Sequence, residues 1–64
     1  MTLSDEQTRW LLTARPDTWQ LDDGASDDLI YECIAIGLVE VGHRRGQWKL
    51  TAAGHHVWCM LRGR

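Results

Sequence analysis

The chain has 64 residues, of which 44% are hydrophobic and 25% charged, and its formal net charge is −2 at pH 7. This length predicts a single domain over residues 1–64 and excludes a doubly wound sheet, a barrel or a second domain. No apolar run reaches the roughly 18 residues that a membrane-spanning helix needs. The two cysteines are isolated and the N-terminus lacks a basic start and an apolar core, so we expect a cytoplasmic protein without an export signal.

Charge is divided unevenly along the sequence. All 9 acidic residues precede Gly42, whereas 5 of the 7 lysines and arginines, and all 3 histidines, follow it. This division predicts a dipolar molecule whose basic part attracts an anionic partner. The alternative is that the acidic and basic parts face each other within the molecule and neutralise.

The N-terminal third predicts a helix and an extended segment. Ser4 with Gln7 forms a capping box, and Pro16 ends the helix that starts there. Helical spacing predicts a buried face through Leu3, Gln7, Trp10, Leu11 and Ala14. Residues 18–21 alternate like a short strand or an extended linker, with Trp19 and Leu21 on one side, and residues 22–24 form a turn.

A second helix is predicted from Ser26, which caps it, to Gly37, which ends it in a left-handed conformation. Its predicted buried stripe contains Leu29, Ile30, Cys33, Ile34 and Gly37. Asp28, Tyr31, Glu32 and Ala35 are predicted to lie on its outward face.

The remaining residues predict a β-hairpin followed by a helix. Segments 38–41 and 48–50 alternate as strands, with Arg44 and Arg45 at the tip between them. We expect Trp48 and Leu50 to be buried beneath the hairpin, against Val57 and Ile34. Thr51 caps the last helix, whose inward residues are predicted to be Ala53, Val57, Met60 and Leu61.

The motifs Ile36-Gly37-Leu38-Val39-Glu40 and Trp48-Lys49-Leu50-Thr51-Ala52-Ala53-Gly54 resemble the second half of winged-helix (winged helix-turn-helix) DNA-binding domains. The resemblance covers about residues 26–61. It implies a trimmed α+β version of that fold, in the order helix, short strand or linker, helix, β-hairpin wing, helix, because residues 16–25 are too few for a further helix. It also implies a small bacterial or phage regulator of transcription that binds nucleic acid.

One feature departs from the family. The helix before the wing would enter the major groove, yet its outward residues are Asp27, Asp28, Tyr31, Glu32 and Ala35. Reading base edges calls for Arg, Lys, Asn or Gln, and phosphates repel carboxylates. We therefore do not assign the recognition role to residues 26–37.

Two functions remain open at this point, and the family resemblance favours the first, nucleic-acid binding, over the alternative of an interaction module. For binding duplex DNA through the wing, the candidate contacts are the basic residues His43, Arg44, Arg45, Lys49, Arg62 and Arg64. The alternative for the hairpin tip is a charged loop that protects its edge. For a protein-interaction or dimerisation module, the candidate contacts are Asp28, Tyr31, Glu32 and Trp58. A continuous basic face favours DNA, whereas scattered or acid-capped charges favour a protein partner or a second copy.

We expect no metal, cofactor, small-molecule substrate or catalytic activity. His55 and Cys59 are four residues apart and share a helix face, as two zinc ligands can, but a site needs two more. Only Cys33 and His43 remain, and neither has ligand spacing; Cys33 is expected in the core. The chain has no glycine-rich phosphate loop or oxyanion loop that would accompany a catalytic Cys–His pair.

Overall fold

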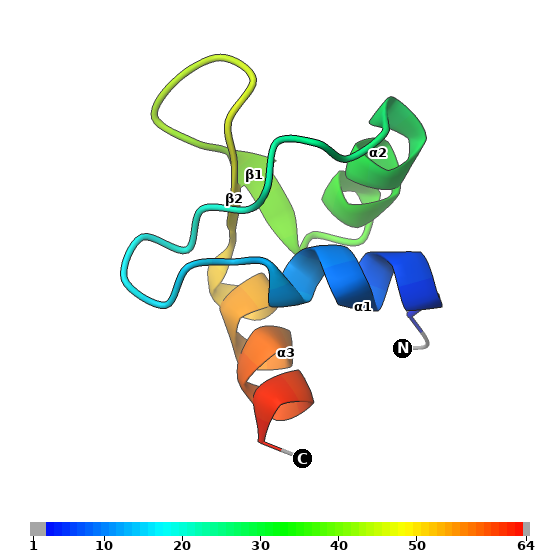
Figure 1. Cartoon of the computed structure of the whole chain (residues 1–64), viewed down its shortest axis with the longest axis vertical. Coiled ribbons are helices and arrows are strands. Elements are labelled where there is room, and N and C mark those ends of the chain that lie inside the picture. The colour runs from blue at the N-terminus through cyan, green and yellow to red at the C-terminus, as the bar shows by residue number, and fades with distance from the viewer. Residues whose placement is uncertain (1–2, 64) are drawn as a thin grey trace.

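The computed structural model describes residues 3–63 as three helices and one antiparallel β-hairpin (Figure 1). In chain order the elements are α1 (Asp5–Leu12), α2 (Asp27–Ala35), β1 (Val39–Val41), β2 (Trp48–Leu50) and α3 (Ala52–Arg62). This confirms the predicted small α+β fold with a winged-helix-like arrangement. Within residues 3–63, no helix is long and apolar enough to cross a membrane.

Helix α1 begins at the predicted capping box. The Ser4 hydroxyl accepts a hydrogen bond from the Gln7 N–H at 3.1 Å, and the Gln7 side chain accepts one from the Ser4 N–H at 2.9 Å. The helix ends at Leu12, before Arg15, the residue that Pro16 excludes from helical geometry. Its last turn tightens, because the N–H groups of residues 13 and 14 donate to carbonyls three residues back.

Residues 13–26 form a linker with turns at 16–18 and 23–24, and its residues 19–21 lie against β2. Gln20 makes a single antiparallel bridge with Lys49, and the Leu21 N–H donates to the Trp48 carbonyl at 2.8 Å. Trp19 has a positive φ of 63°, which interrupts the alternation of a strand. Of the two predicted alternatives, the structure therefore shows a linker with one bridge, and both Trp19 and Leu21 still pack on the core.

The cap of α2, its end at Gly37 and the two hairpin strands follow the prediction, whereas Gly37, predicted in the buried stripe, is exposed. Ser26 caps α2 through the Leu29 N–H, and Gly37 turns the chain with a φ of 80°. The register pairs Val39 with Leu50 and Val41 with Trp48. Val39 and Leu50 are buried on the inner side of the hairpin.

Trp48 is less buried than the sequence predicts. Trp48 is only partly buried, whereas its strand neighbour Leu50 is fully buried. Trp48 pairs with Val41 at the end of the hairpin that leads to the tip, where Val41 itself is 59% exposed. Burial therefore decreases along the hairpin toward its tip.

The predicted inward face of α3 was also partly wrong. Ala53 and Met60 are exposed, Val57 and Leu61 are partly buried, and the buried residues are Gly54 and Trp58. Gly54 packs directly on the backbone of Leu38, and this contact fixes the rotation of the helix about its axis. Trp58, a predicted partner contact, is only 7% exposed and belongs to the core.

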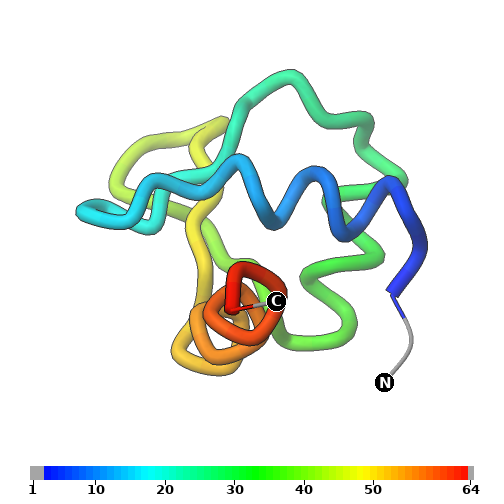
Figure 2. Tube along the Cα trace, turned by 60° about the horizontal axis from the view of Figure 1, so that its bottom comes forward, coloured from blue at the N-terminus to red at the C-terminus, as the bar shows by residue number. Residues whose placement is uncertain are grey.

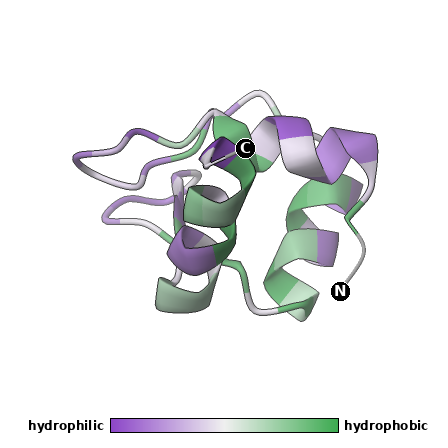
Figure 3. Cartoon of the chain, turned by 90° about the horizontal axis from the view of Figure 1, so that it is seen from below, coloured by the Kyte–Doolittle hydropathy of each residue, from purple (hydrophilic) through white to green (hydrophobic). Residues whose placement is uncertain are grey.

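The core lies where the three helices and the hairpin meet. Figure 2 looks almost along α3. It shows α1 running across the molecule, with the hairpin on one side of α3 and α2 on the other. The buried side chains are Trp10, Leu11, Ala14, Leu21, Ile30, Cys33, Leu38, Val39, Leu50 and Trp58. The turn of the linker and the hairpin tip project from one side of this core and are largely hydrophilic (Figure 3).

Candidate functional site

The wing tip is a closed loop over residues 42–47 that presents basic side chains to solvent. The Gly42 N–H donates to the Gln47 carbonyl at 2.8 Å, and the Gln47 N–H donates to the Arg44 carbonyl at 3.1 Å. Gly46 turns the loop with a φ of 78°. The structure leaves the predicted candidates His43, Arg44 and Arg45 exposed. Among the described residues, neither arginine forms an ion pair.

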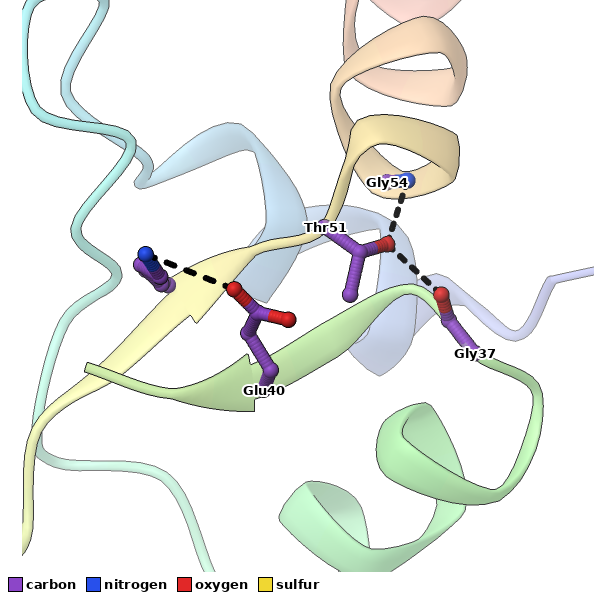
Figure 4. Close-up of polar contacts among 5 residues, drawn as sticks. Gly37, Glu40, Thr51 and Gly54 are labelled. Atoms are coloured by element: carbon purple, nitrogen blue, oxygen red, sulfur yellow. Dashed lines mark hydrogen bonds and ion pairs between the residues drawn. The ribbon is translucent and has the colours of Figure 1, made fainter.

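Lys49, another predicted nucleic-acid contact, faces a carboxylate. It lies directly opposite Glu40 in the hairpin register, and its Nζ is 3.4 Å from the Glu40 Oε1 (Figure 4). This cross-strand pair is partly exposed, so its contribution to folding is small. The pair matters more for the surface charge, because the Glu40 carboxylate offsets the positive charge of Lys49 beside the wing.

Arg62 lies at the opposite end of the molecule from the wing tip. Its guanidinium carbon is 4.7 Å from the centre of the Trp58 ring, in a cation–π contact near the end of α3. Figure 1 shows the wing loop at the top and the end of α3 at the bottom. Arg64, the remaining predicted basic contact, lies outside the described residues. The structure therefore does not join Arg62 with the wing arginines in one basic face.

The outward face of α2 is acidic and carries one aromatic side chain. Asp27, Asp28, Tyr31 and Glu32 are all exposed, and Tyr31 is 67% exposed. The two aspartates occupy the first turn, where the helix dipole favours negative charge. Glu32 accepts a hydrogen bond from the Gln7 side chain of α1 at 2.9 Å, which orients its carboxylate.

A stack of rings, which the sequence pattern did not predict, ties the linker to α3. The His55 imidazole lies between Trp19, with ring centres 4.2 Å apart, and Trp58, with ring centres 5.5 Å apart. The interplanar angles are 14° and 22°. The three-residue spacing of His55 and Trp58 on one helix face is compatible with their contact, but no nearby sequence signal places Trp19 against His55.

The two cysteines differ in burial. Cys59 is exposed, and its Sγ lies 3.8 Å from the His55 Nε2. Cys33 is buried in the core as predicted, and burial, with a smaller effect of the Glu32 carboxylate, raises the pKa of its thiol. In the part of the chain that the structure describes, no three His, Cys, Asp or Glu side chains gather as a metal site would require.

Comparisons of the chain with known protein families, with curated proteins and with solved structures give no match. Function must therefore be inferred from the surface itself. Two features stand out there: an acidic α2 face with an exposed tyrosine, and a wing tip with two adjacent, exposed arginines.

Proposed function

We propose that the protein is a small non-enzymatic module that binds a protein partner through the outward face of α2. The observation that carries this proposal is the acidic outward face of α2, with Asp27, Asp28 and Glu32 exposed around Tyr31. The winged-helix resemblance would place this same helix in the major groove of DNA.

Electrostatics opposes that use of α2. Each carboxylate within about 4 Å of a phosphate costs about 1 kcal/mol in water, and three of them act together. The face also offers no Arg, Lys, Asn or Gln side chain, the residues that most often read base edges. An α2 that is repelled by the duplex and cannot read it is poorly suited to DNA recognition.

The distribution of basic residues supports the same proposal. Binding to a duplex gains most of its affinity from many cationic contacts along the phosphate backbone. Here Glu40 offsets Lys49, and Arg62 packs on Trp58 far from the wing. The wing tip is left with Arg44 and Arg45, and this small cluster supplies few phosphate contacts.

The α2 face has the composition of a protein-binding surface. An exposed tyrosine offers a large rigid area with few side-chain torsions to order, and such aromatic residues often dominate binding energy. The surrounding carboxylates fit a basic partner and reject acidic ones. Tyr31 is thus the expected anchor, and the carboxylates select the charge of the partner.

Backbone amide NMR shifts test this proposal with two probes at about 20 mM salt, where electrostatic attraction reaches beyond about 20 Å. A short arginine-rich peptide containing one leucine is expected to shift the amides of α2 and to leave those of α3 unchanged. Asp28→Asn with Glu32→Gln should remove these shifts. A duplex of mixed sequence should leave α2 unchanged; saturable shifts on α2 with the duplex, or none with the peptide, would overturn the proposal.

Nucleic-acid binding through the wing is the second candidate function. Its supporting observation is that Arg44 and Arg45 are adjacent and exposed at the hairpin tip. Such a tip contacts phosphates or a minor groove without reading the sequence. The first candidate predicts no duplex affinity, so saturable duplex binding that weakens as salt rises distinguishes this candidate from the first.

A further inference from the structure

We infer that the partner is a second copy of this chain, which places its wing tip on the α2 face of the first copy. The inference rests on the proposed function and names its partner. Its basis is charge complementarity within one molecule: the wing tip carries Arg44 and Arg45, and the α2 face carries Asp27, Asp28 and Glu32. All five side chains are exposed.

The wing loop and α2 lie toward the same end of the molecule's long axis, on opposite sides of the core. In Figure 1 the wing loop is at the upper left and α2 at the upper right, and α3 extends away below them. A twofold axis above this end would set the wing of each copy over α2 of the other. Such an interface is closed and self-complementary, as in most small homodimers, and each contact occurs twice.

Apolar side chains accompany the charges on both surfaces. Tyr31 is 67% exposed on α2, and Val41, the last residue of β1 before the wing loop, is 59% exposed. An arginine over the face of a tyrosine adds a cation–π contact, which is comparable to an exposed ion pair and becomes stronger when the contact is desolvated. Burial of these side chains between copies would also support a domain whose own core is small.

Sedimentation equilibrium of the full chain, at low and at high salt, tests the inference. We expect a monomer–dimer equilibrium in which high salt favours the monomer. Arg44→Glu with Arg45→Glu should weaken dimerisation by about tenfold or more, since like charges then meet across both contacts. The change lies in an exposed loop, so circular dichroism should show an intact fold. As a matched control, Arg9→Glu with Arg15→Glu changes the net charge equally on exposed positions elsewhere and should leave the equilibrium unchanged.

Charge exchange gives the sharper outcome. Asp28→Lys with Glu32→Lys should also weaken self-association. Mixing this variant with the Arg44→Glu, Arg45→Glu variant should restore a dimer, because one of the two reciprocal contacts then pairs lysines with the introduced glutamates and the other keeps the native arginines and carboxylates. Three results would overturn the inference: a strictly monomeric wild type, a dimer that neither double substitution weakens, or a mixture of the two variants that stays monomeric. A monomeric wild type whose α2 amides still shift with the arginine-rich peptide would overturn this inference and leave the proposed function standing.

Discussion

Gly54 of α3 packs against the backbone of Leu38, at the point where the chain enters β1. A Cβ atom at position 54 would lie 2.9 Å from the Leu38 carbonyl carbon and closer still to its oxygen. Both sides of this contact are backbone, so neither can move aside as a flexible side chain would. The contact brings α3 onto the hairpin and turns Trp58, one helical turn later, into the core.

Gly54→Ala tests this contact by the sign of its effect. Helix propensity alone predicts that alanine stabilises α3 by roughly 1 kcal/mol. The clash with Leu38 predicts the opposite, a loss of about 1–3 kcal/mol or more, because the backbone must separate. Urea unfolding measures the difference. The control Ala53→Gly, at an exposed neighbouring position, should cost roughly 1 kcal/mol by propensity alone. A Gly54→Ala protein more stable than wild type would contradict the contact.

Thr51 joins the end of α2 to the start of α3. Its hydroxyl accepts a hydrogen bond from the Gly54 N–H at 3.0 Å and donates one to the Gly37 carbonyl at 2.6 Å (Figure 4). Thr51→Val keeps the shape and removes both bonds, so we expect a loss of about 1–2 kcal/mol. Thr51→Ser keeps the hydroxyl and should retain most of the stability. Equal midpoints for the two variants in thermal unfolding would show that the hydroxyl has no such role.

Local sequence signals predicted the elements well. Each helix start follows from a cap that acts within three residues, at Ser4, Ser26 and Thr51. The hairpin follows from alternation on both sides of a glycine-containing turn. These features depend on neighbours in sequence, and for that reason the order of elements could be predicted without knowledge of the packing.

Long-range contacts were less predictable. The rotation of α3 depends on the approach of Gly54 to Leu38, which periodicity does not encode. Helical spacing therefore predicts Met60 inward and leaves Trp58 as a candidate partner contact, whereas the structure exposes Met60 and buries Trp58. The stack of Trp19 on His55 joins residues far apart in sequence and depends on a positive φ at Trp19. For the candidate surface, the sequence predicted the acidic α2 face, but the separation of Arg62 from the wing required the structure.

Thiol reactivity is expected to separate the two cysteines. Cys59 is exposed and Cys33 is fully buried. A disulfide reagent should therefore modify one thiol per chain rapidly under native conditions, and the second only after unfolding by denaturant. Cys59→Ser should abolish the rapid reaction and leave the slow one. Rapid modification of both thiols in the folded wild type, or of the remaining thiol in folded Cys59→Ser, would place Cys33 outside the core.

Cys33 also predicts a loss of stability at alkaline pH. Burial raises the pKa of its thiol in the folded protein, with the Glu32 carboxylate adding to the effect. Below the ordinary thiol pKa of about 8.5, both states keep the proton and this group adds no pH dependence. Above it the unfolded chain releases the proton first, so the free energy of unfolding should fall as pH rises. Denaturant titrations at several pH values should show that the free energy of unfolding falls less with rising alkaline pH for Cys33→Ala than for wild type. We expect that variant to be less stable than wild type at every pH. An identical slope in both proteins would contradict the assignment.

The acidic face of α2 should act as a barrier to DNA. Wild-type protein is expected to show no saturable binding to a duplex in fluorescence anisotropy at about 20 mM salt, where attraction is strongest. Asp27→Asn with Asp28→Asn removes two negative charges while keeping side chains of nearly the same size at the helix start. This variant should bind duplexes of different sequence more tightly than wild type and about equally, because phosphate contacts carry no sequence information.

Adding Arg44→Ala and Arg45→Ala to that variant shows whether the wing touches the phosphates. Each phosphate contact that is removed should reduce the slope of log affinity against log salt by about 0.9, so removal of both arginines should flatten it by about two. The Arg62→Ala change, which lies on α3 away from the wing, should alter the slope far less. Tight binding by wild type would exclude the barrier, and an unchanged slope without the two arginines would exclude the wing as the contact.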